Sequence, residues 1–268
     1  MKSMLTVVKE HIQNFYLIIR LSFFEVKSSN NDNYLGILWE ILNPTIQILI
    51  YWFVFGFGIR GGQNVGNIPF LPWLLSGIVV WFFINQALLQ GSRSIYSRIN
   101  IISKLNFPIS VTPTFVIVSK FYHHIILVLI IILILFSYNF PVTLYIVQLP
   151  YFSIATFAVL ISISLITSTL ATIVRDIQMI VQSIVRFLLY LSPILWTVDK
   201  LPKSIQLLMK VNPFYYIVEG YRSALLGQGW YVVENLTYTI YFWCLVFVLF
   251  FIGSILHVKF RKHFVDYL

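Results

Sequence analysis

Residues 114–136 read TFVIVSKFYHHIILVLIIILILF, and every residue from Ile125 to Phe136 is apolar. About 20 apolar residues in a row are enough for an α-helix to cross the hydrocarbon core of a bilayer. Hydrophobic residues make up 59% of the 268 positions, and charged residues only 10%. This composition excludes a soluble domain with a polar surface, so the stretch predicts an integral membrane protein.

Further apolar stretches flank this one on both sides, and together they predict an all-α membrane domain of six transmembrane helices over residues 31–258. The predicted spans are Tyr34–Ile59, Ile68–Leu89, Thr114–Phe136, Leu144–Val174, Ile177–Val198 and Leu236–Val258. Residues 1–30 carry apolar side chains every three or four positions, with charges on the other side. This pattern predicts a cytoplasmic amphipathic helix that lies in the membrane interface, as a plain anchor or with a mechanical role. Residues 259–268 are predicted to form a charged cytoplasmic tail.

A pair of short helices is predicted between spans five and six. Asn212 and Pro213 are typical of a helix start, and Gly227 is typical of a helix end. Pro202 is expected to open the other helix of the pair. Because each helix is too short to cross a bilayer, the pair is predicted either to dip into the membrane as a re-entrant helix or to rest on it. The order of the six spans predicts that this pair is extracellular. Glu219 and Arg222 are three residues apart and are expected to pair on that helix.

The formal net charge of +9 is interpreted as a consequence of membrane topology. Six spans place both termini on one side, and most of the Lys and Arg residues fall on that side. Since positive residues collect on the cytoplasmic face, we expect a multi-pass plasma membrane protein with both termini in the cytoplasm, bound by membrane lipids and not by nucleic acid. The single cysteine, Cys244, is predicted to be a buried, inert thiol.

Two stripes of polar residues are predicted within the spans. Span one carries Glu40, Asn43, Gln47 and Tyr51, and span five carries Gln178, Gln182, Arg186 and Tyr190, at helical spacing. Lipid tails cannot satisfy such groups, so both stripes are expected to face protein or a wet cavity. Helix–helix contacts and a substrate pathway remain equally open interpretations. Arg186 is expected either to serve the substrate pathway as a cation within a span or to pair with Glu40.

Two further groups of residues are candidates for function. His123 and His124 in span three are interpreted as a satisfied core pair, with a proton relay as the alternative. The polar stretches on the inner side between spans are predicted to dock a partner ATPase. The docking candidates are Ser103, Lys104, Leu105, Asn106, Phe107, Arg175 and Asp176.

Catalytic sequence motifs are absent from the chain. It contains no G-x-x-x-x-G-K-[ST] loop, no G-x-S-x-G, no H-E-x-x-H and no paired acidic motif in a cytoplasmic loop. We therefore expect a chain that is not an enzyme and holds no cofactor or metal, with its energy supplied from outside. An integral membrane transferase acting on lipid-linked sugars and a noncatalytic scaffold are the alternatives.

Several motifs, in order along nearly the whole chain, resemble one family. They are YLGILWEILNP at 34–44, LNFP at 105–108, RDIQ at 175–178, SPILW at 192–196 and NPFYYIVEGYRSALLG at 212–227. The chain is similar to the ABC-2 family of polysaccharide export permeases, and within it to the wall teichoic acid exporters of Gram-positive bacteria. The resemblance implies a homodimer joined to two copies of an ATPase subunit that uses ATP and Mg. It also implies export of a lipid-linked polyanionic polymer, with O-antigen or capsule permeases as the alternative.

Overall fold

The computed structural model describes residues 1–29, 34, 36–99, 107–199, 201–262 and 264. These residues form helices joined by turns, with an isolated β-bridge between Val65 and Ile68. The all-α class predicted from the sequence is confirmed.

The helices follow one another in three groups along the described chain. The first contains α1 (Lys2–Gln13), α2 (Phe15–Ser29), the 3-10 turn η1 (Gly36–Leu38), α3 (Trp39–Tyr51) and the π-helix η2 (Trp52–Ile59). The second contains α4 (Phe70–Arg93), η3 (Ile109–Val111), α6 (Thr112–Ser137), η4 (Leu144–Val147) and α7 (Gln148–Ile173). The third contains α8 (Ile177–Leu191), α9 (Lys203–Lys210), α10 (Pro213–Leu226), α11 (Tyr231–Glu234) and α12 (Leu236–Phe260).

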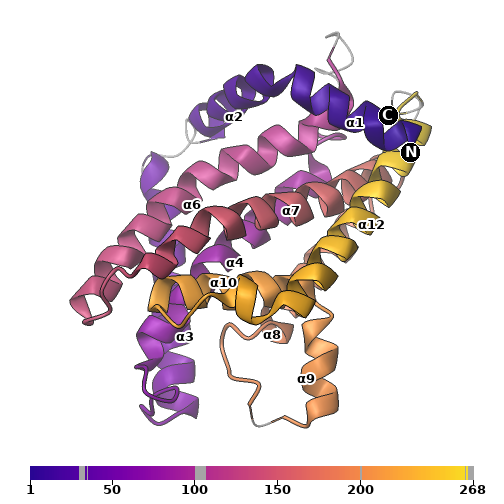
Figure 1. Ribbon diagram of the computed structural model, residues 1–268. Coiled ribbons are helices and arrows are strands. Elements are labelled where there is room, and N and C mark those ends of the chain that lie inside the picture. Colours follow the sequence, from indigo (N-terminus) through magenta and orange to yellow (C-terminus); the bar gives the residue numbers. More distant parts are fainter. Residues whose placement is uncertain (30–33, 35, 100–106, 200, 263, 265–268) are drawn as a thin grey trace.

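The molecule has two distinct ends (Figure 1). Both termini lie at one end, where α1 and α2 run across the bundle, and we call it the termini end. The lower end of α3 and the helix α9 lie at the opposite end, which we call the far end. Helix α10 runs across the bundle between the two ends.

Five helices of the described chain are long and apolar enough to cross a membrane. They are Trp39–Ile59, Phe70–Arg93, Ile109–Ser137, Leu144–Ile173 and Leu236–Phe260. Helix α8, at the place of predicted span five, has only 15 residues, a rise of about 22 Å against the roughly 30 Å of a bilayer core. The sixth crossing therefore stays a prediction.

Span five was predicted to continue to Val198, but its helix ends at Leu191. Pro193 is the cause, because a proline disfavours the helical conformation of the residue before it, and Ser192 has an extended backbone (φ −96°, ψ 149°). The chain then turns inward, and Ile194 and Leu195 are completely buried.

The single N-terminal helix expected from the sequence is two helices, broken at Asn14. The side-chain amide of Asn14 donates to the carbonyl of Glu10 at 2.8 Å, a local bond that competes with the helical ladder. Val7 and Ile18 are buried against the bundle. The apolar residues on the opposite side are exposed, including Leu5, Ile12, Phe15, Tyr16 and Phe23. The helix pair therefore has one face on the protein and a second, uncovered apolar face.

The predicted helix boundaries between spans five and six are confirmed. The Asn212 side chain accepts a hydrogen bond from the backbone N–H of Phe214 at 3.0 Å, and Gly227 ends α10 with a φ of 68°. The alternative in which the two helices rest on the surface is wrong for α10, because almost all side chains of α10 are buried. Helix α10 packs against α4 and α7, so the helix is part of the bundle.

Helix α4 forms the centre of the core, and residues along its whole length are buried. Helix α12 packs along α7 at the edge of the bundle. The prediction that Cys244 is buried is wrong, because Cys244 lies on the uncovered side of α12 and is exposed. One side of an apolar helix cannot be told from the other by hydrophobicity when both sides are apolar.

Candidate translocation surface

The polar stripe of span one lies on a helix that the chain leaves largely bare. Only 11% of the residues in the apolar 18-residue stretch of α3 and η2 are buried, against 83% of the residues in the corresponding stretch of α4. Asn43 and Gln47 are exposed, and Glu40 and Tyr51 are half-buried. The predicted stripe therefore does not face a neighbouring helix of the same chain along most of its length.

The stripe of span five is divided between two roles. Gln178 is a helix–helix contact, because its Oε1 accepts a hydrogen bond from the Ser92 hydroxyl at 2.6 Å and its Nε2 donates to the Leu89 carbonyl at 3.1 Å. Gln182 is half-buried, while Arg186 and Tyr190 are exposed. The first residue of the stripe holds α8 on α4, and the later ones point away from the core.

The two stripes approach each other toward the far end. Tyr51 and Tyr190 are close enough to interact electrostatically. Beyond them, the guanidinium of Arg60 donates a hydrogen bond to the Thr197 hydroxyl at 3.3 Å. The bare face of α3 and η2 and the bare face of α8 therefore form one surface, with polar groups along it.

Glu40 has different neighbours from those expected. It lies within electrostatic range of Lys120 and His123 on α6, and no ion pair joins it to Arg186 in the described chain. The carboxylate within range of His123 thus comes from another helix, which the sequence of span three does not contain. Lys120 is buried, and Glu40 is one of the acidic groups that offset its charge.

The two histidines of α6 have separate surroundings. His124 Nε2 is hydrogen-bonded to the Tyr221 hydroxyl at 3.0 Å, which in turn contacts the Ser153 hydroxyl at 2.9 Å. Neither ring nitrogen of His123 has a hydrogen-bond partner among the described residues. We expected both histidines to have their hydrogen bonds satisfied within the core. This holds for one ring nitrogen of His124 and does not hold for His123.

The docking candidates are described only in part. Ser103, Lys104, Leu105 and Asn106 lie outside the described residues. Phe107 packs in a small cluster with Ile18 and Val111, so it links α2 to the start of α6. Arg175 and Asp176 are exposed on the turn between α7 and α8. Docking of a partner on these residues stays a prediction.

A polar junction at the termini end was missed by the sequence reading. Glu10 accepts hydrogen bonds from the Ser110 hydroxyl and, at 2.6 Å, from the Arg261 guanidinium. His11 contacts the Thr114 hydroxyl through Nε2 at 2.7 Å. Burial lowers the pKa of His11 below its ordinary value of 6.5. These contacts join α1 to the start of α6 and to the end of α12. Glu10 and its two partners are 100 and 251 positions apart in the sequence. Local sequence patterns cannot predict contacts at such separations.

The predicted pair of Glu219 and Arg222 is confirmed as an ion pair. Arg222 is buried, donates from Nη2 to the Pro193 carbonyl at 2.7 Å, and stacks over the Trp73 ring at 3.9 Å. Its role is therefore inside the bundle, at the contact of α10 with α4.

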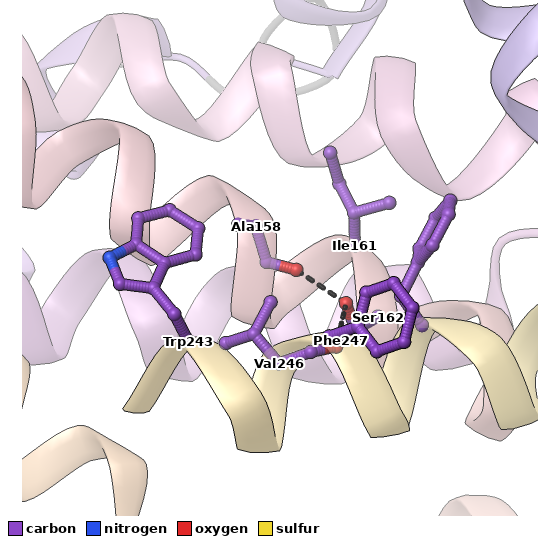
Figure 2. A pocket seen from close by; sticks show the side chains of 7 residues that line it. Ala158, Ile161, Ser162, Trp243, Val246 and Phe247 are labelled. Atoms are coloured by element: carbon purple, nitrogen blue, oxygen red, sulfur yellow. Dashed lines mark hydrogen bonds between the residues drawn. The ribbon is translucent and has the colours of Figure 1, made fainter. Parts of the chain in front are cut away.

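A groove of about 460 Å³ between α7 and α12 is shown in Figure 2. Ile161, Trp243 and Phe247 are among its apolar walls, and the Ser162 hydroxyl already donates to the Ala158 carbonyl at 2.6 Å. Since no polar group there is left to orient a polar cargo, this groove suits lipid chains better than a translocation path.

Residues 16–226 match the sequence profile of the family described as ABC-2 type transporter. The chain belongs to this family. As an ABC-2 family member it is a membrane-embedded transport subunit, and it is not itself a catalytic enzyme. No group of His, Cys, Asp and Glu within the described chain could hold a metal ion.

Three curated relatives of this ABC-2 chain are named "O-antigen export system permease protein RfbA". One, from Myxococcus xanthus, is 25% identical over 222 residues, which are 82% of this chain and 84% of the relative. One from Klebsiella pneumoniae is 25% identical over 255 residues, 95% of both chains. A second Klebsiella pneumoniae protein is 24% identical over 214 residues, 80% of this chain and 81% of the relative. The similarity thus covers at least 80% of this chain and of each relative.

Proposed function

We propose that the protein is the permease subunit of an ATP-driven exporter of a lipid-linked polysaccharide, with an O-antigen-type sugar chain as cargo. The observation that carries the proposal is the similarity, over 80–95% of this chain, to three permeases named for O-antigen export, within a family of membrane transport subunits. Wall teichoic acid, which the motifs imply, is the second candidate cargo, and these relatives do not support it.

Two features of the chain indicate what it needs from partners. Its sequence has no P-loop, so ATP and Mg would be bound by a separate ATPase subunit, in two copies for a dimeric permease. The face formed by α3 and α8 is uncovered in a single chain and carries polar groups that lipid cannot satisfy. A second copy of the chain placed on this face would enclose the polar stripes, which supports a homodimer with the path between two copies.

The orientation in the membrane is part of the same proposal. With both termini in the cytoplasm, the far end faces outward. A cysteine placed at Lys203 or Gln228, with Cys244 changed to Ser, should react with an impermeant thiol reagent added from outside. Cysteine at exposed Lys2 is the matched inner control and should react only after the membrane is opened. Labelling of position 203 or 228 from the cytoplasmic side alone would contradict the orientation.

The cargo is tested by reconstituting the permease with its ATPase in proteoliposomes and supplying defined lipid-linked polymers. We expect ATP-dependent translocation of a neutral sugar chain, and slower or no translocation of a glycerol phosphate polymer of equal length. Preference for the phosphate polymer would favour teichoic acid over the O-antigen type. Sugar transfer by the permease alone would contradict transport and favour the transferase.

A further inference from the structure

Two adjoining cavities open at the far end of the molecule. The first, of about 420 Å³, is lined by Phe55, Arg60, Gln63 and Trp196 among others. The second, of about 290 Å³, is lined by Trp73, Asp199, Tyr215, Glu219, Arg222 and Gln228 among others. Thr197 lines both cavities, and its hydroxyl accepts the hydrogen bond from Arg60. The cavities therefore lie side by side along the segment that follows α8.

Arg222 is a fixed cation in the wall of the second cavity. The side chain is 2% exposed and is held by Glu219, by the Pro193 carbonyl and by the face of Trp73. Its Nε has no hydrogen-bond partner among the described residues. Because this atom is closed off from the cavity, the hydrogen-bonding groups that a ligand can reach there come from the other lining residues.

The entrance of the second cavity carries free polar groups. Asp199 and Gln228 are exposed, and neither side chain has a hydrogen bond to any described residue. Tyr215 is buried against the same space. Together with Arg222, these groups provide carboxylate, amide, hydroxyl and guanidinium functions around a single cavity.

The charge of the cavities distinguishes between possible ligands. Among the described residues of the lining, Arg60 and Arg222 are matched by Asp199 and Glu219, so their charges balance. A phosphate in the second cavity would face two carboxylates in a region of low dielectric, where repulsion between like charges is strong. The site therefore disfavours a polyanion and suits a neutral molecule rich in hydroxyl groups.

We propose that these two cavities bind adjacent neutral sugar units of a polysaccharide. Phe55 and Trp196 supply aromatic surface for the apolar face of a sugar ring, and the polar groups around Arg222 bind hydroxyl groups. The volumes are near the lower end of ligand pockets, which span about 300–1,000 Å³. This proposal rests on the proposed export function in one respect, which is the source of the sugar chain.

The test uses the full chain in lipid nanodiscs and a neutral hexose trisaccharide that carries a diazirine group. After irradiation, mass spectrometry should find the label on residues 193–199 and on residues 55–73. A glycerol phosphate trimer with the same diazirine should give little label there. Equal or stronger labelling by the phosphate trimer, labelling confined to other segments, or no binding of the trisaccharide would overturn the proposal.

Substitutions at the exposed entrance locate the site without disturbing the core. Asp199→Ala and Gln228→Ala should each weaken trisaccharide binding roughly three- to tenfold, the effect of losing one hydrogen bond. The control Lys203→Ala, on exposed α9 and outside both linings, should bind as the unchanged protein does. Unchanged binding by both entrance variants would also overturn the proposal.

The export assay separates failure of the sugar site from failure of the proposed function. ATP-dependent export of a neutral polymer without any cross-link in the cavities would disprove the site and leave the function standing. Specific cross-linking in a complex that exports no polymer would support the site and contradict the function.

Discussion

Helices α3 and α4 are neighbours in the chain and are both apolar enough to span a membrane, yet their surroundings are opposite. In the apolar 18-residue stretch of α3 and η2, 11% of the residues are buried, whereas in that of α4 83% are buried. Leu49, Ile50 and Phe53 on the first are more than half exposed. Hydrophobicity brings both helices into the membrane, but it does not say whether lipid, protein or a second copy will cover them.

Close packing explains why α4 can be central. A Cβ added at Gly77 would lie 2.5 Å from Nη2 of Arg222, and one at Gly91 would lie 2.5 Å from the Ser164 hydroxyl. These glycines let α10 and α7 approach the α4 backbone. A Cβ added at Gly58 in η2 would lie 3.9 Å from its nearest neighbouring atom. Gly58 therefore allows no comparable close approach of helices among the described residues.

The largest difference between the two helices should appear when matched glycines are changed. Gly77→Ala should lower the free energy of unfolding by about 1–3 kcal/mol, since Arg222 is held on several sides and cannot move aside freely. Gly58→Ala should be neutral or stabilising by up to about 1 kcal/mol through helix propensity. Unfolding followed in lipid micelles gives both values, and equal effects would remove the distinction between a covered and a bare helix.

Arg186 tests whether the bare surface is functional. Arg186→Gln should reduce ATP-dependent export about five- to tenfold, or about 1–1.4 kcal/mol, because the proposed path would lose an exposed guanidinium. The amount of assembled complex should not change, since the side chain pairs with no described residue. Ser183→Ala, also exposed on α8, is the control. Normal export by a stable Arg186→Gln protein would contradict the role of this surface.

Glu40 tests the polar connection between the bare α3 and the covered α6. In a double-mutant cycle, Glu40→Gln and Lys120→Met should show a coupling energy of about 1 kcal/mol, because the two groups interact electrostatically across the helices. The pair Glu40→Gln and Lys9→Gln, with Lys9 exposed on α1, should be additive. Additivity of the first pair would mean that α3 is held without Glu40.

His11 should give the smallest effect, at the covered face of α1. Its pKa is lowered by burial, so the unfolded chain takes up the proton first. The stabilisation is complete above about 6.5 and is lost as the pH falls below that value toward the lowered pKa. The melting temperature of the protein should therefore drop more between pH 7.5 and 5.5 than that of His11→Gln. An equal drop in both proteins would contradict this.

Helix positions and ends could be read from local chemistry. Asn212, Pro213 and Gly227 determine the ends of α10 through their own backbone preferences and one side-chain bond, and these features do not depend on distant residues. The same holds for the polar stripes and for the pairing of Glu219 with Arg222, three residues apart. The end of α8 could also have been predicted from Pro193, whose effect on Ser192 is local. The predicted end of this span, Val198, lies seven residues after its actual end at Leu191.

The partners of these residues could not be read in the same way. Glu40 interacts electrostatically with Lys120 and His123, Gln178 binds α4, and Glu10 binds Arg261. Each interaction joins residues from separate helices, and an apolar helix offers several sides on which a neighbour can pack with similar energy. The exposed Cys244 is an example, since both sides of α12 are apolar.

The sequence by itself determined that this protein is an all-helical membrane chain, where most of its helices lie, and which residues are polar within them. Bilayer thickness, proline, glycine and capping act over a few residues, so they are visible in a linear pattern. Only the tertiary structure decided that α4 is enclosed, that α3 is bare, and that α10 enters the bundle to place Arg222 beside Trp73. Those outcomes depend on shape complementarity between distant segments, which the periodicity of any one segment does not contain.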